Sequence, residues 1–235
     1  MSYFVVWRHI SPQVGKDDEV LEILKPIIQH AKDSSDAVVG LWVWKKTPEE
    51  PKNGIVPWMY GEAKGRPFTG EEPAVMIQEV ETDHQAFVGS VTYKAFEADT
   101  QGLLTCPPHE QHLVPGTGFP FRDGNPYKTT DKLHAVTARV AYKPGTLPQG
   151  VDCWKTVASY VKESEVDGTL MYWFLTDAAD PTGLHSLEVY RDVDAFDVHK
   201  VCDAVVNNRS NQVDVLKIRT GVEIRDLKQV MSSFD

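Results

Sequence analysis

The stretch LEVYRDVDAF at residues 187–196 repeats an earlier stretch, QEVETDHQAF at residues 78–87, without a gap. In both copies a short apolar strand carrying Glu-Val leads into Asp, then Ala-Phe, then a segment of helical character. A repeated unit of this kind is not expected to bury its apolar face alone, so the two copies are expected to pack on each other. The repeat therefore predicts two copies of one fold in a single chain.

Composition excludes several classes of protein. The chain has 235 residues and a formal net charge of −10, and divided after residue 120 it carries 10 basic against 17 acidic residues, then 14 against 17. Both parts are acidic, so neither offers the basic surface that nucleic acid or an anionic membrane requires. There is no secretory pattern or membrane-length apolar run, and the three cysteines are widely spaced. We therefore expect a cytoplasmic protein with reduced thiols and neither a nucleic-acid nor a membrane partner.

Hydrophobic periodicity predicts the same order of elements in both halves. In the first half the expected elements are a strand at 3–10, a helix with its apolar stripe at 20–31, strands at 38–46 and 74–81, and a helix at 83–104. In the second they are a strand at 134–142, a helix at 151–165, strands at 170–176 and 184–190, a helix at 192–209 and a strand at 213–223. This order predicts an α+β fold of two tandem ferredoxin-like (βαββαβ) units.

The predicted boundaries give a first unit at 1–115, a connector rich in Pro and Gly at 116–132, and a second unit at 133–235. A long loop at 47–73 interrupts the first unit, and its length suits either a lid or a segment without fixed structure. Each sheet has helices on one face only. The remaining apolar faces can close a barrel within the chain or pair with another copy, and the sequence does not separate these outcomes.

The second half also resembles a known family. The aromatic strand Tyr172-Trp173-Phe174, the aspartates Asp177 and Asp180 in the following hairpin, and residues 187–200 are similar to the antibiotic biosynthesis monooxygenase type of dimeric α/β-barrel protein. The likeness is good over 133–225 and looser over 2–104. It implies a small-molecule pocket between sheet and helices in each unit.

The resemblance also implies a chemistry. Many members oxidise aromatic phenols and anthrones with molecular oxygen and use no flavin, metal or haem, because an electron-rich substrate anion can itself reduce oxygen. The implied function is a cofactor-independent monooxygenase for an aromatic or enolisable intermediate of secondary metabolism. Two alternatives stay open: a non-oxidative isomerase, cyclase, dehydratase or decarboxylase in the same pocket, and a ligand-binding or scaffold protein without catalysis.

Two residues of the second copy are candidates for catalysis. Helical spacing places His199 on the inward half of its helix, where an imidazole could accept a proton near neutral pH. Tyr190 stands where oxygenases of this type often carry a strand aromatic, and it could stack on a ligand and donate a hydrogen bond. Both could instead be structural. The first copy has Ser90 and Glu81 at these positions, so the second unit alone is expected to act in this way.

Aromatic side chains are the candidates for substrate binding. They are Trp154, Tyr172 and Trp173 in the second unit and Trp42, Trp44 and Trp58 in the first. Trp42 and Trp44 could equally fill the barrel. The repeated carboxylates Glu79 and Glu188 could act on substrate, but a solvated or ion-paired role is favoured. The pair His109 and His112 follows two prolines, which argues against a metal-binding helix, so we predict no metal. The family resemblance implies that no cofactor is needed.

Overall fold

The computed structural model describes residues 4–33, 38–46, 75–81, 84–122, 127–128, 130 and 132–233. These divide into two compact units. The first unit holds the described residues up to Lys46, from Val75 to Val114 and from Gln229 onward, and the second runs from Pro115 to Lys228. The predicted loop at 47–73 lies outside the described residues. Within them, no helix is both long enough and apolar enough to cross a membrane.

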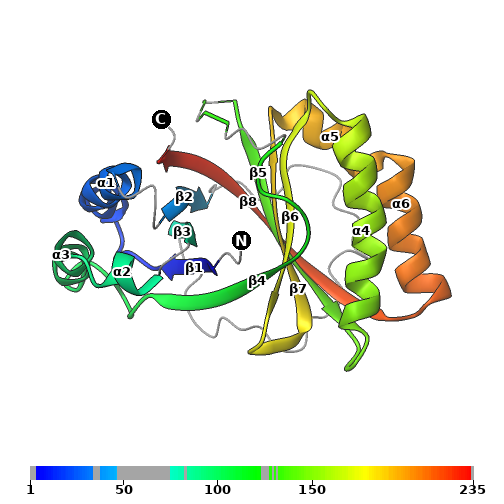
Figure 1. Ribbon diagram of the computed structural model, residues 1–235, viewed down its shortest axis with the longest axis horizontal. Helices are drawn as coiled ribbons and strands as arrows, with labels where there is room; N and C mark the ends of the chain where they lie inside the picture. The colour runs from blue at the N-terminus through cyan, green and yellow to red at the C-terminus, as the bar shows by residue number, and fades with distance from the viewer. Residues whose placement is uncertain are drawn as a thin grey trace. The chain divides into compact units, whose positions relative to one another are not determined.

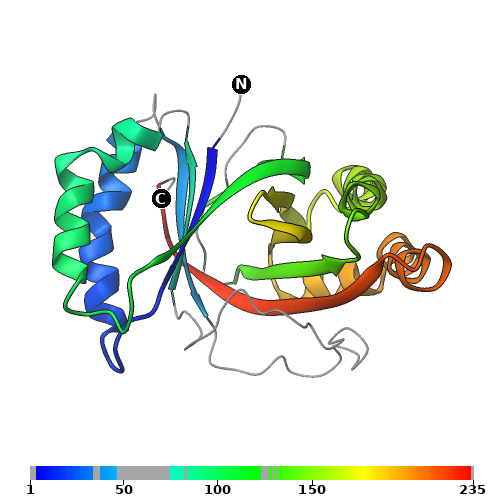
Figure 2. The same cartoon turned by 90° about the horizontal axis from the view of Figure 1, so that it is seen from below.

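The first unit has the predicted order of strands and helices. Its elements are β1 (Phe4–Ile10), α1 (Asp17–Asp33), β2 (Val38–Lys46), β3 (Val75–Glu81), α2 (His84–Val88), α3 (Val91–Thr100) and the first part of β4 (His109–Phe119). Strand β3 pairs antiparallel with β1 and β2, and β1 also pairs with β4. Helices α1 and α3 cover one face of this sheet (Figures 1 and 2), where Leu41 and Val43 pack with Leu24 and Ile27.

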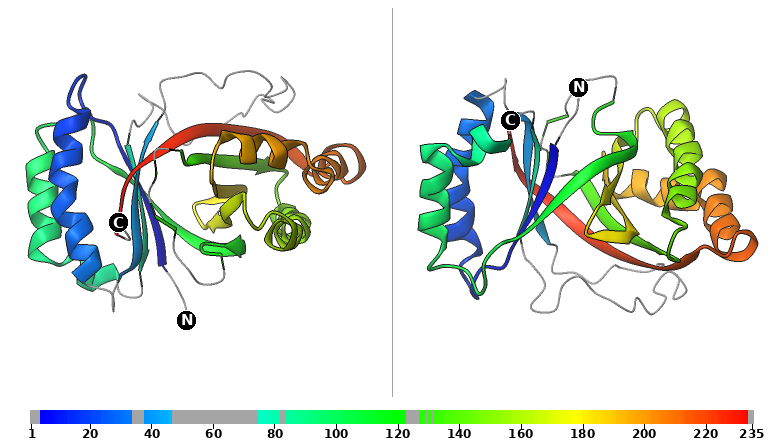
Figure 3. Two further views of the ribbon diagram at one scale, coloured as in Figure 1. Left: turned by 90° about the horizontal axis from the view of Figure 1, so that it is seen from above. Right: turned by 60° about the horizontal axis from the view of Figure 1, so that its bottom comes forward.

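The second unit repeats this arrangement. Its elements are β5 (His134–Tyr142), α4 (Leu147–Ser164), β6 (Thr169–Asp177), β7 (Asp180–Tyr190), α5 (Val193–Val201), α6 (Asp203–Ser210), the π-helical turn η2 (Asn211–Val215) and β8 (Arg219–Ser232). Strand β7 pairs with β5 and β6, and β5 pairs with β8, all antiparallel. Helices α4, α5 and α6 lie on one side of these strands (Figures 1 and 3). Both units are therefore ferredoxin-like, which confirms the predicted fold class.

Helix boundaries differ from the prediction in both units. The helix expected at 83–104 is divided, because Ser90 adopts an extended conformation and its hydroxyl caps α3 by accepting a hydrogen bond from the Tyr93 amide. The helix expected at 192–209 is likewise broken, because Cys202 is extended with ψ 148°. Asp192 caps the first part, since its carboxylate accepts from the Ala195 amide. Short polar side chains of this kind satisfy the free N–H groups at a helix start.

Strand β4 replaces part of the predicted connector. Residues 109–119 are extended despite their Pro and Gly content. Gly118 has φ +93°, and a Cβ at this position would overlap the carbonyl oxygen of Tyr172 on β6. Glycine therefore allows a close approach between two strands here, a use of this residue that composition alone does not distinguish from a loop. The last strand is also displaced, beginning at Arg219 after the π-helical turn.

Strands β4 and β8 each begin in one unit and end in the other. Ser233, the last described residue, lies beside β2 in the first unit, where its amide donates to the Leu41 carbonyl at 2.8 Å. The Leu41 amide in turn donates to the Ser233 hydroxyl at 3.0 Å. Each unit thus receives the final residues of a strand that starts in the other.

Candidate functional site

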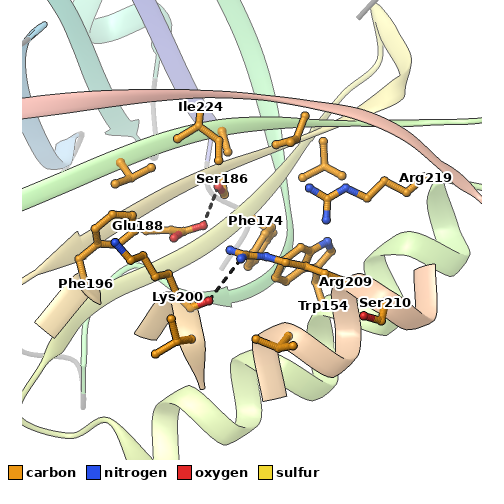
Figure 4. A pocket seen from close by; sticks show the side chains of 16 residues that line it. Trp154, Phe174, Ser186, Glu188, Phe196, Lys200, Arg209, Ser210, Arg219 and Ile224 are labelled. Atoms are coloured by element: carbon orange, nitrogen blue, oxygen red, sulfur yellow. Dashed lines mark hydrogen bonds between the residues drawn. The ribbon is translucent and has the colours of Figure 1, made fainter. Parts of the chain in front are cut away.

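The second unit contains a cavity of about 210 Å³ between its helices and the face of its sheet. Three aromatic side chains, Trp154, Phe174 and Phe196, contribute to a wall that is otherwise mostly valine, isoleucine and alanine. Figure 4 shows the polar side chains that also line it, which are Ser186, Glu188, Lys200, Arg209, Ser210 and Arg219. A mostly apolar cavity with a few charged groups has the composition of a small-molecule site.

The alternation of strand residues explains how these groups reach one side of the sheet. Ser186, Glu188 and Tyr190 are two residues apart on β7, so their side chains share a face. Glu188 stands opposite Val136 of β5 in the antiparallel register, and Ser186 stands opposite Ala138. All four of these facing residues line the cavity.

Two hydroxyl groups hold the carboxylate of Glu188. The Ser186 hydroxyl donates to Glu188 Oε1 at 3.0 Å, and the Tyr190 hydroxyl donates to Oε2 at 2.7 Å. Burial raises the pKa of Tyr190 well above its usual value, and the charge of Glu188 adds to this effect. Tyr190 therefore keeps its proton and serves as a donor. Among the described residues, no cation lies within ion-pair distance of Glu188.

Three basic residues give the cavity an excess of positive charge. Lys200 is compensated, because its Nζ lies 2.6 Å from a carboxylate oxygen of Asp197. Among the described residues, Arg209 donates to one acceptor, the Lys200 carbonyl at 3.3 Å. Burial lowers the pKa of Arg219 to about 10. Tyr142 raises this pKa and the charge of Arg209 lowers it, both by less than burial does. Arg219 nevertheless remains charged at neutral pH.

The indole of Trp154 is fixed in the cavity wall. Its Nε1 donates to the Tyr142 hydroxyl at 2.9 Å, and that hydroxyl donates to Gln212 Oε1 at 2.7 Å. The Trp154 ring also stacks on Phe174, with ring centres 4.8 Å apart. Gln212 lies in the π-helical turn, a distortion that is often found at functional sites. The aromatic wall is thus held in place by hydrogen bonds at its back.

His199 lies inward, as helical spacing predicts, but it is paired away from the cavity. Its side chain is 2% exposed, and its Nδ1 lies 2.9 Å from a carboxylate oxygen of Glu165. Burial would raise the pKa of Glu165, but the hydrogen bond and charge of His199 and the Thr169 hydroxyl lower it below the usual value. This pair joins α5 to the residue that ends α4. His199 is not among the residues that line the cavity.

This pair belongs to a set of three potential metal ligands. Candidate ligand atoms of Glu165, His199 and Cys202 all lie within 4.8 Å of one another. Zinc accepts all three ligand types. Their polar atoms already bond among themselves, however, and burial raises the pKa of the Cys202 thiol. His109 and His112 are three residues apart on β4, so their side chains leave opposite faces of that strand.

Comparison with known proteins identifies the fold. No family model and no curated protein matches the sequence. A "putative monooxygenase" from Fusobacterium nucleatum subsp. nucleatum is 13% identical, with 98% of this chain and 94% of that chain covered and a TM-score of 0.78. A second "putative monooxygenase", from Lactobacillus acidophilus, is 11% identical over 99% and 96% of the two chains, with a TM-score of 0.73. An anthrone oxidase-like protein is 9% identical over 98% and 92%, with a TM-score of 0.61.

The chain has the same fold as these three proteins. This likeness extends through both units, because each of the three matches covers nearly the whole chain. The resemblance seen in the sequence is thus confirmed for the fold. At these identities the comparisons give no residue roles, so the chemistry of the cavity has to be worked out from its own side chains.

Within this fold the predicted binding residues are divided between the two units or lie outside the described residues. Trp154 lines the cavity, whereas Tyr172 and Trp173 are buried on β6 and do not line it. Trp42 and Trp44 are fully buried on β2 of the first unit, and Trp58 lies outside the described residues.

Tyr190, the second predicted catalytic residue, contacts His199 with ring centres 5.2 Å apart. It does not line the cavity, but it touches two residues that do, Glu188 through its hydroxyl and Phe196 through its ring. The two cavity arginines were not predicted, because single basic residues on a helix and at a strand start form no recognisable motif. Glu188 did carry a signal, as a carboxylate repeated in both copies.

Proposed function

We propose that the second unit is a cofactor-independent monooxygenase that oxidises a small aromatic or enolisable molecule with molecular oxygen. The main support is the Glu188 carboxylate, which two hydroxyl donors hold in an aromatic cavity. The fold shared with two proteins named as putative monooxygenases is consistent with this chemistry. Glu188 takes the role of proton acceptor that the sequence suggested for His199.

Glu188 is placed to remove a proton from the substrate. An ionised carboxylate has about four lone-pair positions, and Ser186 and Tyr190 occupy one on each oxygen. A phenolic or enolic hydroxyl of the substrate can donate to a remaining position and transfer its proton. The excess positive charge of the cavity wall then stabilises the substrate anion.

The anion can react with oxygen without a further reductant. It gives one electron to O2, the two radicals combine through a new C–O bond, and a peroxide anion results. Protonated Glu188 returns its proton to this peroxide. The O–O bond then breaks while the substrate carbon loses its hydrogen, which leaves a carbonyl group and water. Both hydrogens of the water come from the substrate, so a phenol and O2 give a quinone and H2O in balance.

The size of the cavity limits the substrate. An apolar cavity of about 150 Å³ accommodates benzene, and this one measures about 210 Å³. The space suits one substituted aromatic ring or a compact two-ring system. The walls formed by Trp154, Phe174 and Phe196 can stack on or contact the edge of such a ring.

Oxygen consumption tests the proposal. Purified protein is incubated with hydroxylated one-ring and two-ring aromatics in an oxygen electrode, and the product is analysed by mass spectrometry after reaction with ¹⁸O2. We expect one ¹⁸O atom in the product and the other in water. Glu188→Gln should reduce turnover by about 10² to 10⁴ fold, the usual contribution of a general base. Glu163→Gln, an exposed change on α4, serves as the matched control and should leave turnover unchanged.

Three results would contradict parts of this assignment. Turnover that persists undiminished without oxygen would favour an isomerase, cyclase, dehydratase or decarboxylase. Binding without any turnover would favour a ligand-binding protein. Full activity of the Glu188→Gln variant would remove Glu188 as the base.

A further inference from the structure

We infer that the substrate carries a carboxylate group, which Arg209 and Arg219 bind together in the cavity of the second unit. This deepens the oxygenase assignment and rests on it for the identity of the bound molecule as substrate. The ligand class is a hydroxylated aromatic carboxylate. Its hydroxyl group faces Glu188 and its acid group faces the two arginines.

Arg219 has a buried donor without an acceptor. Its Nη1 is inaccessible to solvent and has no hydrogen-bond partner among the described residues. A buried N–H group without a partner is costly, and native proteins rarely leave one unexplained. Because Arg219 lines the cavity, an oxygen atom of a bound ligand can supply the missing acceptor.

Arg209 adds a second uncompensated charge to the same wall. No carboxylate within the described ranges forms an ion pair with either arginine, whereas Lys200 in the same cavity has Asp197. Arg209 is close enough to disfavour the charge of Arg219, which contributes to the lowered pKa of Arg219 after the larger effect of burial. An anion between them removes this repulsion. The chain as a whole carries a net charge of −10, so the local excess of positive charge is not a general property of its surface.

The arginines enter the cavity from a different direction than the base. Arg219 stands opposite Tyr142 on β5, and Glu188 stands opposite Val136. Six residues of a strand span about 20 Å, and the long arginine side chain covers part of that separation. Figure 4 shows Arg219 and Arg209 extending toward Trp154 and Phe174, with Glu188 beside Phe196. The cavity therefore offers a proton acceptor and a cationic group to different parts of one ligand.

A carboxylate fits these groups in shape and in charge. The planar guanidinium donates two parallel hydrogen bonds that match the two oxygens of a carboxylate. A cavity that accommodates benzene has a volume of about 150 Å³. The observed 210 Å³ leaves room for a carboxylate substituent on such a ring.

Binding of matched acids and amides tests this inference. The dissociation constants of 4-hydroxybenzoate and its neutral isostere 4-hydroxybenzamide are measured by isothermal titration calorimetry under nitrogen. We expect the acid to bind about 10 to 100 fold more tightly, the range for hydrogen bonds to a charged group. Arg209→Gln and Arg219→Gln should each remove most of this preference while changing the affinity for the amide less than about threefold. Arg191→Gln is the control, because this arginine is 58% exposed and pairs with Asp192 outside the cavity.

The outcomes separate this inference from the oxygenase assignment. Three results would overturn the carboxylate inference. They are equal affinity for acid and amide, no binding of either at millimolar concentration, and a preference for the acid that survives loss of both arginines. Circular dichroism confirms that each variant is folded. Arg219→Lys keeps the charge but loses the planar fork, so it should retain part of the preference for the acid. Acid binding with the expected arginine dependence but without oxygen uptake would support the carboxylate site and reject the oxygenase.

Discussion

Replacing His199 by alanine distinguishes a structural from a catalytic histidine. The change removes a hydrogen bond to the Glu165 carboxylate, and such bonds to charged groups contribute about 1.5 to 3 kcal/mol. It also removes ring contacts with Tyr172 and Tyr190, at centre distances of 5.0 and 5.2 Å. Aromatic contacts of this kind add about 0.5 to 1.5 kcal/mol each. We therefore expect His199→Ala to lower the free energy of unfolding by about 3 to 5 kcal/mol.

The measurement is a thermal melt followed by circular dichroism, with oxygen uptake recorded on the folded protein. For a chain of this size each kcal/mol shifts the melting temperature by about 2 to 4 °C, so a decrease of about 6 to 20 °C is expected. Val198→Ala is the control, because Val198 is the neighbouring residue on α5 and is 66% exposed. A His199→Ala protein with unchanged melting temperature and abolished oxygen uptake would refute the structural role and restore His199 as a catalytic candidate.

Three further changes test the architecture around the cavity. The folded-state pKa of Glu165 is lowered from its ordinary 4.5. The wild-type protein should therefore be more stable than Glu165→Gln above about pH 4.5, and this difference should disappear as the pH falls through the lower folded value. Urea unfolding at a series of pH values measures the difference. Gly118→Ala should destabilise by about 2 kcal/mol or more through its positive φ and steric overlap, whereas Gly102→Ala, which meets no atom within 4 Å, should be nearly neutral. Tyr142→Phe leaves the Trp154 indole N–H without its acceptor, so calorimetry should show weaker binding of both hydroxybenzoate and its amide.

The fold could be predicted because its signals are local and repeated. Strand β5 begins and ends at the predicted residues, His134 and Tyr142, and β2 does the same at Val38 and Lys46. Apolar alternation and three-to-four residue spacing depend only on neighbours along the chain, and the duplication provides each signal twice. The order of elements in both units followed from these patterns alone.

The ends of helices and strands depend on contacts that the spacing of apolar residues does not reveal. Ser90 was compared with His199 as a loss of chemistry, but its hydroxyl caps a helix. Gly118 looked like a loop residue because the strand it approaches, β6, lies more than fifty residues further along the chain. In both cases a backbone requirement, a free amide or a close carbonyl, determined the residue type. Such requirements become visible only when the partner is known.

The candidate site also has one part that the sequence pattern predicts and one part that it does not. Residues within the repeated stretch place Glu188 on the cavity face, since strand alternation aims it at the helices together with Ser186 and Tyr190. The arginines have no counterpart in that stretch, because Arg209 comes from the helix after the Cys202 break and Arg219 from the strand after the π-helical turn. Both irregularities come after the repeated stretch in the chain. Each stands a few residues before one of the two arginines. The duplication thus accounts for the scaffold and the proposed base, whereas the proposed carboxylate specificity comes from the part of the second unit where regular structure was interrupted.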